Sequence, residues 1–328
     1  MRWMNSCDGG CLIVASGSRW SVVIPTWNGR HLLAEALDGL GRQSLQDFET
    51  VVVDDASDDD TCDWLRKRWP DVITVELPGR RGLAHAVNCG IAVSQTERLA
   101  LLNNDAVPDP DWLEQLDRAF DEFPEAGFLA SRILLYAAPE RLHAAGDFFT
   151  ANGLPGNRGV WQRDSAVFDE PCEVFGACMA ASAYRRSVFE AVGRLDEDLV
   201  MYCEDVDLSW RAQLAGYRCR YVPSARVRHR RGASATGELE SFLVGRNRIL
   251  VMAMNMPGFV IRRCWWSILL GQAQIALEAM RHSRGRAARA TLNGQIAAIP
   301  HMWWALRKRR RRQRERGVNA TYVWSLLD

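Results

Sequence analysis

Short apolar runs typical of buried strands alternate with segments of helical spacing along the first hundred residues. Residues 21–25 form a compact β-branched run, and after Asn28 and Gly29 the apolar side chains of residues 32–40 recur at helical spacing. Alternation of this kind predicts an α/β domain around a mainly parallel sheet with right-handed crossovers. Further strands are expected at residues 48–53, 73–77 and 99–102, and helices from a cap at Ser57 or Asp58 to residue 69 and over residues 82–93.

Polar clusters follow three of the expected strands, at residues 25–27 (PTW), 54–55 (DD) and 103–105 (NND). The carboxyl ends of parallel strands lie at one edge of a sheet, and open α/β sheets bind their ligands beyond that edge. We therefore expect the three clusters to converge on one ligand site.

The pattern changes in the rest of the chain. Residues 140–169 are rich in Gly, Asn and isolated aromatic residues, which suggests loops or an antiparallel excursion. A helix is expected over about residues 204–215, with Gly216 as its C-cap, and long helical patterns rich in Arg and Trp begin near residue 238. We predict an N-terminal extension (residues 1–19), an α/β domain (20–237) and a helical, polybasic region (238–328).

Charge balance, cysteine content and apolar segments indicate which partners and which cellular compartment to expect. The 41 basic and 40 acidic residues nearly cancel, so the net charge gives no reason to expect a nucleic-acid partner. The nine cysteines are scattered without paired spacing, which favours reduced thiols in a cytoplasmic protein. Residues 11–15 are too short for a signal-peptide core, and polar side chains interrupt residues 264–280. We therefore expect neither secretion nor a spanning helix.

Asp54 and Asp55 are adjacent carboxylates at a strand end. Such a pair can accept hydrogen bonds from the N3–H of a pyrimidine base and from ribose hydroxyls. The alternative is that both residues form only a turn and a helix cap, which is common for Asp between a strand and a helix.

Asp105 ends the third polar cluster, residues 103–105. A diphosphate leaving group needs its charge neutralised, and Mg²⁺ or Mn²⁺ bound by few carboxylates does this. Asp105 is the candidate ligand. Its alternative role is that of a turn residue before the helix expected at Pro110.

Glu204 and Asp205 fall at the expected start of a helix, where the helix dipole keeps carboxylates ionised. An ionised carboxylate there can take a proton from an acceptor hydroxyl. The alternative is a set of acidic residues at a helix start, with Asp207 and Arg211 paired one turn apart.

His229 lies in a basic segment, residues 226–231 (RVRHRR). It can bind a metal or a phosphate, with the neighbouring arginines holding a diphosphate. A solvated histidine in a basic strand is the alternative. Four groups of candidate residues occur in this order along the chain: residues 54–55, residues 103–105, residues 204–205 and His229. Their joint occurrence favours one shared site over four unrelated turns.

Together these clusters resemble the family 2 glycosyltransferases, which have the Rossmann-like GT-A fold, over residues 21–234 and more loosely to about residue 312. Residues 22–29 are similar to the family's opening strand and nucleotide-binding turn, and Asp55 stands where the family reads the pyrimidine base. Residues 82–91 (GLAHAVNCGI) are similar to the GLAxAxNxGI segment that lines the donor site. The residues that the resemblance implies for nucleotide-sugar binding are Pro25, Thr26, Trp27, Asn28, Asp54, Asp55, Gly82, Asn88, Asn103 and Asn104.

The catalytic and metal-binding residues follow from the same resemblance. Residues 103–105 occupy the place of the DxD motif, which implies Asp105 as a ligand of Mg²⁺ or Mn²⁺, although Asn103 replaces the first Asp. Glu204 and Asp205 match the ED motif, which implies Asp205 as the catalytic base with Glu204 supporting it.

His229 and residues 232–234 resemble the HxxGxS segment, which implies a metal or diphosphate contact for His229. The implied reaction is a single displacement, in which the acceptor hydroxyl attacks the anomeric carbon opposite the diphosphate and inverts its configuration. The likeness to rhamnosyltransferase-like members favours dTDP-rhamnose as the donor. A polyprenyl-linked saccharide destined for a cell-surface polymer is the expected acceptor.

The last third of the chain combines aromatic residues with a basic run at residues 307–312 (RKRRRR). Trp265, Trp266, Trp303 and Trp304 precede that run, and amphipathic helices of this composition bind anionic leaflets. We expect peripheral association with the inner face of the cell membrane. The alternatives are packing helices with a solvated basic tail, or non-specific nucleic-acid binding, for which no recognition fold is visible.

Two other functions remain open on sequence grounds. A sugar nucleotidyltransferase would carry a Gly-rich loop with Arg and Lys after the first strand, which residues 25–29 lack. A sugar-nucleotide-binding protein without turnover is consistent with Asn103, but the pair Glu204 and Asp205 argues against it.

Overall fold

Four parallel strands form the first half of the central sheet in the computed structural model, which describes residues 3–5, 17–230 and 237–327. Their apolar side chains are buried on both faces, as expected for strands that are covered by helices on either side. These strands are β2 (Trp20–Thr26), β3 (Phe48–Asp54), β4 (Ile73–Glu76) and β5 (Arg98–Leu102), and the helices α1 (Arg30–Leu40), α2 (Thr61–Arg68) and α3 (Leu83–Val93) connect them.

Most antiparallel pairs lie in the second half of the sheet. The strand order is β1-β4-β3-β2-β5-β12-β7-β13-β11, with β12 antiparallel to both of its neighbours and β7 parallel to β13. The prediction of an α/β fold with a parallel-rich sheet is confirmed, and the antiparallel excursion is found in β8, β9 and β10. The remaining strands are β1 (Trp3–Asn5), β6 (Ala106–Pro108), β7 (Ala126–Leu135), β8 (Ala138–Ala145), β9 (Asp147–Phe149), β10 (Pro155–Asn157), β11 (Cys172–Val174), β12 (Ala181–Arg185) and β13 (Arg218–His229).

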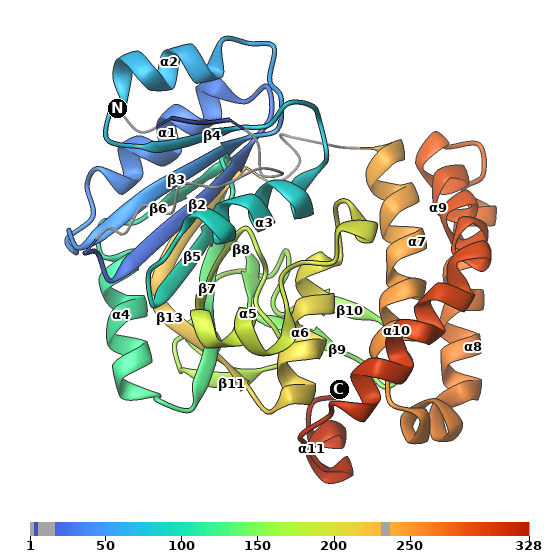
Figure 1. Ribbon diagram of the computed structural model, residues 1–328. Helices are drawn as coiled ribbons and strands as arrows, with labels where there is room; N and C mark the ends of the chain where they lie inside the picture. Colours follow the sequence, from blue (N-terminus) through green and yellow to red (C-terminus); the bar gives the residue numbers. More distant parts are fainter. Residues whose placement is uncertain (1–2, 6–16, 231–236, 328) are drawn as a thin grey trace.

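Helices cover both faces of the sheet (Figure 1). Helices α1 and α4 (Trp112–Glu122) bury Trp20, Trp112 and Phe120 on one face, while α3, α5 (Arg186–Val192) and α6 (Glu204–Ala215) pack on the other. The aromatic side chains fill most of the space between α4 and the sheet, so the first face has a well-packed core.

Two helix ends test the predictions made from the sequence. Helix α6 spans Glu204–Ala215 and stops at Gly216, whose φ of +98° is the left-handed conformation that favours glycine at a C-cap. Helix α2 begins at Thr61 after Asp60, so the cap predicted at Ser57 or Asp58 is wrong. Ser57 instead donates to the Asp54 carboxylate and closes the turn after β3.

A block of helices follows residue 237 and stands beside α6 (Figure 1). It starts at Glu238, where the sequence pattern changes, but the division of the chain into domains stays a prediction. Among the described residues, no helix combines the length and hydropathy needed to cross a membrane. The block consists of α7 (Glu238–Asn255), α8 (Gly258–Arg281), α9 (Arg286–Ala297), α10 (Met302–Arg314) and α11 (Ala320–Ser325).

Candidate functional site

A cavity of about 490 Å³ opens at the carboxyl edge of the parallel strands. The ends of β2, β3 and β5 meet there with the start of α6 and the first turns of α7. The three polar clusters therefore converge as expected. The predicted site residues that line the cavity are Pro25, Thr26, Trp27, Asp55, Gly82, Asn103, Asn104, Asp105, Glu204, Asp205 and His229.

Three predicted donor-binding residues do not line this cavity. Asp54 accepts hydrogen bonds from the Ser57 backbone N–H and hydroxyl, so its carboxylate is used in the turn that the sequence left as an alternative. The Asn28 side chain accepts from the backbone N–H of Asp58 at 2.8 Å. Asn88 binds the backbone of Leu195 through both ends of its amide. Asp54 closes its own turn, whereas Asn28 and Asn88 join segments that are distant in the sequence.

Asp55 faces the cavity and also holds one of its walls. Its carboxylate accepts hydrogen bonds from the backbone N–H groups of Arg81 and Gly82, at 2.7 and 2.8 Å. Gly82 has a φ of +93°, and a Cβ at this position would stand 2.8 Å from Cγ1 of Val200. The backbone can approach the loop before α6 this closely only because residue 82 is glycine.

Arg80 is a cavity residue that the sequence analysis missed. Its guanidinium carbon lies 3.4 Å from the ring centroid of Trp27, and both side chains line the cavity. A guanidinium that stacks on an aromatic ring is held in place and keeps its donors free for an anionic ligand. An Arg in a loop after a strand, with no motif around it, gave no signal in a single sequence.

Asp105 and His229 form the candidate metal site. Asp105 is buried, its Oδ1 accepts no well-aligned hydrogen bond from the described residues, and Nε2 of His229 lies 3.0 Å from it. The described residues contain no group of three or more His, Cys, Asp or Glu side chains arranged for a metal. Mg²⁺ uses one or two protein carboxylates together with substrate phosphates and water, so an orphaned carboxylate oxygen beside an imidazole fits such an ion.

His143 and Asp147, from β8 and β9, add two side chains that the sequence did not indicate. The His143 ring stacks on His229 with a centroid distance of 4.8 Å, and Asp147 accepts a hydrogen bond from Asn157 at 2.7 Å. Both line the cavity. They belong to the segment predicted as loops or an antiparallel excursion, where no motif marks a functional residue.

The loop before α6 is strained. Val200, Tyr202 and Cys203 have φ values of 65°, 67° and 65°, a region that non-glycine residues rarely adopt. Each such residue costs about 1–3 kcal/mol and persists only where its surroundings hold it. This strain sets the entry into α6 and hence the position of Glu204 and Asp205.

Helix α7 supplies much of what holds the loop. The Asn247 side chain is fully buried, and its amide nitrogen lies 2.8–2.9 Å from the carbonyl oxygens of Leu199, Met201 and Tyr202. The backbone N–H of Ala84 donates to the carbonyl of Val200. A polar side chain beyond the predicted domain boundary therefore fixes the loop before α6.

A buried ion network anchors the first turn of α6 at Asp207. Asp207 accepts hydrogen bonds from Arg211 at 2.8 Å, from Arg312 at 2.5 Å and from Asn255 at 2.8 Å. Arg312 also contacts Asp196 at 3.0 Å. Burial alone would raise the pKa of Asp207, but the charges of Arg312 and Arg211 lower it well below its ordinary value.

This network includes two of the cations in the basic run of α10, residues 307–312. Arg312 is buried, and Lys308 donates to Asp196 at 2.6 Å, so neither belongs to a solvated tail. The predicted pair of Asp207 with Arg211 is present, but it lies inside the protein and includes a third partner.

Three carboxyl groups crowd the cavity beside the loop. Burial, and then repulsion from Asp205, raises the pKa of Glu204 to about 8. The same two causes raise the pKa of Asp147 well above its usual range. Burial also raises the pKa of Asp205, but the backbone N–H groups of Met179 and Val206 donate to its carboxylate and favour the ionised form. Burial and repulsion therefore favour the protonated form of Glu204 near neutral pH, while the two N–H donors favour the ionised form of Asp205.

The family model described as Glycosyl transferase family 2 matches residues 21–193, which is more than half of the chain. The chain belongs to this family. The match covers the sheet through β12 and ends before α6, so Glu204 and Asp205 lie beyond it.

Curated relatives of this chain include bacterial glycosyltransferases. The chain is 31% identical to the pre-mycofactocin glycosyltransferase of Mycobacterium tuberculosis over 64% of its own length and 42% of that protein. It is 26% identical to the N-acetylglucosaminyl-diphospho-decaprenol L-rhamnosyltransferase of the same organism, over 90% of this chain and 95% of that one. This family 2 chain thus spans less than half the length of the pre-mycofactocin glycosyltransferase and nearly all of the L-rhamnosyltransferase.

Solved structures support the fold. The mannosyltransferase PcManGT from Pyrobaculum calidifontis, in complex with GDP-Man and Mn²⁺, aligns over 94% of this chain and 87% of its own, with a TM-score of 0.52 and 19% identity. S. aureus TarS, residues 1–349, aligns over 90% of this chain and 89% of its own, with a TM-score of 0.53 and 17% identity. At these identities the likeness establishes a shared architecture.

Replacing Arg312 tests the ion network. Arg312→Met leaves Asp207 buried with one charge partner fewer, so the free energy of unfolding should fall by about 3 kcal/mol. Urea unfolding measures the change. Arg311→Met, at an exposed position on the same helix, is the matched control and should stay within about 0.5 kcal/mol of wild type. Equal effects of the two substitutions would contradict the network's role.

The raised pKa of Glu204 predicts a pH-dependent stability. A carboxyl whose pKa is higher in the folded state stabilises the fold at low pH and loses that contribution as pH rises toward about 8. Glu204→Gln removes this titration, so its stability relative to wild type should grow by roughly 1 kcal/mol for each pH unit between about pH 5.5 and 7.5. Urea unfolding across that range provides the measurement, and a constant difference would show that Glu204 titrates normally.

Proposed function

We propose that this chain is an inverting glycosyltransferase that moves a sugar from a nucleoside-diphosphate sugar to a hydroxyl of a lipid-linked saccharide. The observation that carries the proposal is the convergence of Asp205 and Glu204 with Asp105 and His229 in one cavity at the carboxyl edge of the parallel strands. In this proposal Asp205 provides the base, and Asp105 with His229 provides the place for the diphosphate.

Asp205 is the proposed catalytic base. It takes the proton of the acceptor hydroxyl, whose oxygen then attacks the anomeric carbon from the face opposite the diphosphate. Its raised pKa makes it a stronger base than an exposed Asp while its N–H donors keep it ionised. Glu204 supports it as the neutral neighbour whose protonation avoids a second negative charge.

The nucleotide end of the donor belongs at the ends of β2, β3 and β5. Asp55 is the proposed acceptor for the base, and Trp27 with Arg80 forms the outer wall of that half of the cavity. Asn104, which donates to the Thr26 hydroxyl at 2.9 Å, keeps the two strand ends together.

Asp105 and His229 would hold a divalent cation, Mg²⁺ or Mn²⁺. When bound, such an ion neutralises charge on the departing diphosphate. Asn103 provides an amide where the family's motif has a carboxylate, so this chain offers the ion one charged ligand fewer from that motif.

dTDP-rhamnose is the proposed donor. The support is the likeness over 90% of the chain to a relative named as an L-rhamnosyltransferase. That relative's name also includes a diphospho-decaprenol, which supports a polyprenyl-linked saccharide as the acceptor here. An acceptor of this kind places the protein at the inner face of the cell membrane, and exposed Trp265, Trp266 and Trp303 on the C-terminal helices suit a peripheral contact.

Release of nucleoside diphosphate tests the proposed activity. Purified protein is given dTDP-, UDP- and GDP-sugars with a polyprenyl-linked acceptor, with and without Mn²⁺ or Mg²⁺. We expect cation-dependent turnover of one donor, and Asp205→Asn should lower the rate by at least about a hundredfold because it removes the base. Asp71→Asn, at an exposed position outside the cavity, is the control for a lost carboxylate.

Two results would contradict the proposal in different ways. Donor binding without turnover, with all acceptors present, would favour a sugar-nucleotide-binding protein. Absence of binding by any donor would show that the cavity is not a sugar-nucleotide site.

A further inference from the structure

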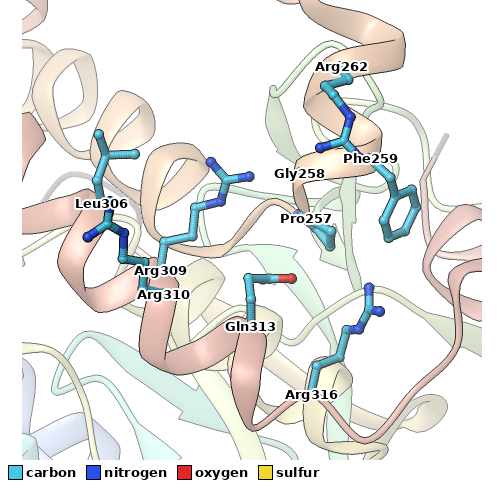
Figure 2. A pocket seen from close by; sticks show the side chains of 9 residues that line it. All are labelled: Pro257, Gly258, Phe259, Arg262, Leu306, Arg309, Arg310, Gln313 and Arg316. Carbon is cyan, nitrogen blue, oxygen red and sulfur yellow. The ribbon is translucent and has the colours of Figure 1, made fainter.

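A second cavity, of about 540 Å³, opens between the start of α8 and the last turns of α10 (Figure 2). Arg262 lines it from α8, Arg309 and Arg310 line it from α10, and Arg316 follows the end of α10. We call it the arginine cleft. It shares no lining residue with the catalytic cavity.

Two guanidinium groups converge in the arginine cleft. A Cβ placed on Gly258 would stand 3.1 Å from Nη2 of Arg309 and 3.4 Å from Nη1 of Arg262. Figure 2 shows Arg309 reaching across from α10 toward Arg262, while Arg316 points toward the ring of Phe259. Burial, and then repulsion from Arg262, lowers the pKa of Arg309. Two like charges are thus held close together at a cost in stability.

No carboxylate in the described part of the chain pairs with these charges. Among the described residues, none of the four cleft arginines forms an ion pair, although Lys308 and Arg312 on the same helix pair with Asp196 and Asp207. The N-terminus of α8 also faces the cleft at Gly258, and its first turn has no acidic residue. The partial positive charge of a helix N-terminus adds to that of the guanidiniums. An anion is the ligand that this arrangement fits.

Exposed apolar stripes continue from the cleft along both helices. On α8, Trp265, Trp266 and Leu269 follow Arg262 at helical spacing, and Trp266 is 59% exposed. On α10, Leu306 and Trp303 precede Arg310 by one and two turns, and Trp303 is 67% exposed. A basic cleft bordered by apolar and tryptophan side chains is typical of surfaces that meet lipid headgroups and acyl chains together.

We propose that the arginine cleft binds the phosphate headgroup of an anionic membrane lipid while the apolar stripes of α8 and α10 enter the acyl region. The proposal rests on the membrane contact in the proposed function, to which it adds a defined headgroup site. Guanidinium groups bind phosphate oxygens in pairs of parallel hydrogen bonds, so several of them around one cleft suit a phosphomonoester, which offers more free oxygens and more charge than the phosphodiester of phosphatidylserine.

The acceptor's own diphosphate is not the ligand of this cleft. Val244 lines the catalytic cavity and Pro257 lines the arginine cleft, and the α7 residues from Val244 to its end at Asn255 span about 17 Å. An acceptor in which one sugar is joined to a diphosphate, as in the name of the L-rhamnosyltransferase relative, is too short to extend from one to the other. The cleft therefore orients the protein on the membrane instead of presenting the substrate.

Vesicle co-sedimentation of the full chain tests the site. Phosphatidylcholine vesicles carry either phosphatidic acid, whose phosphate is a monoester, or phosphatidylserine, at matched surface charge. The cleft variant is Arg262→Gln with Arg309→Gln, and the control is Arg311→Gln with Arg314→Gln, two exposed positions of α10 outside the cleft.

Wild type should prefer phosphatidic acid. Each charge removed from the control should weaken its binding by about fivefold, which is the contribution of one cation to diffuse attraction. The control should keep the preference for phosphatidic acid. The cleft variant should lose at least about tenfold more and bind both lipids alike, with an unfolding temperature equal to or above that of wild type, because a repulsion is removed.

Three results would overturn the proposal. Equal losses in both variants would leave only diffuse membrane attraction, which the proposed function allows but the arginine cleft does not. Wild type that binds neither vesicle would remove the membrane contact itself, while donor turnover would still stand. Saturable binding of inorganic phosphate in calorimetry, with no affinity for vesicles, would assign the cleft to a soluble anion.

Discussion

The carboxylate of Asp207 has no access to solvent, and it keeps its charge because Arg211, Arg312 and Asn255 surround it. A buried charge of this kind is tolerable only when its partners are in place, so α6, α7 and α10 must pack together for any one of them to be stable there. Asp207 lies on the first turn of the helix that begins at Glu204. The interaction that joins the C-terminal helices to the α/β domain therefore also fixes the helix on which the proposed base sits.

The strained loop before α6 explains why such support is needed. Three non-glycine residues with positive φ would relax if the loop were free, and relaxation would move Asp205 away from the N–H groups of Met179 and Val206. Asn247 prevents this by holding three backbone carbonyls of the loop through one side chain. The crowding of Glu204, Asp205 and Asp147 is a second cost at the same place, and it separates their protonation states. Strain and charge repulsion are thus concentrated where the chemistry is proposed.

Much of the α/β domain could be predicted because local patterns agree with the fold. The strands near residues 21–25 and 48–53, the helix ending at Gly216 and the converging clusters all follow from periodicity and strand-end chemistry. The sequence could not tell which of Asp54 and Asp55 faces the cavity, since alternate residues of a strand end point in different directions and either can close a turn. In the structure, the Asp54 carboxylate accepts a hydrogen bond within the turn, and Asp55 lines the cavity.

Side-chain contacts between residues that are distant in the sequence could not be predicted from local sequence patterns. Arg312 looks like any member of a solvated basic run, and only its packing against Asp207 from more than a hundred residues away distinguishes it from Arg311. Asn247, His143 and Asp147 are likewise single polar residues without a motif. The segment predicted to resemble HxxGxS at residues 232–234 lies outside the described residues, so its role stays a prediction.

The anomeric configuration of the product tests the central claim most directly, because a single base and one displacement leave only one stereochemical outcome. The new glycosidic bond can be assigned by NMR from a donor of known configuration. The account predicts that the bond is inverted relative to the donor. A retained configuration would require a second nucleophilic step and would contradict the role of Asp205 as the base of a single displacement.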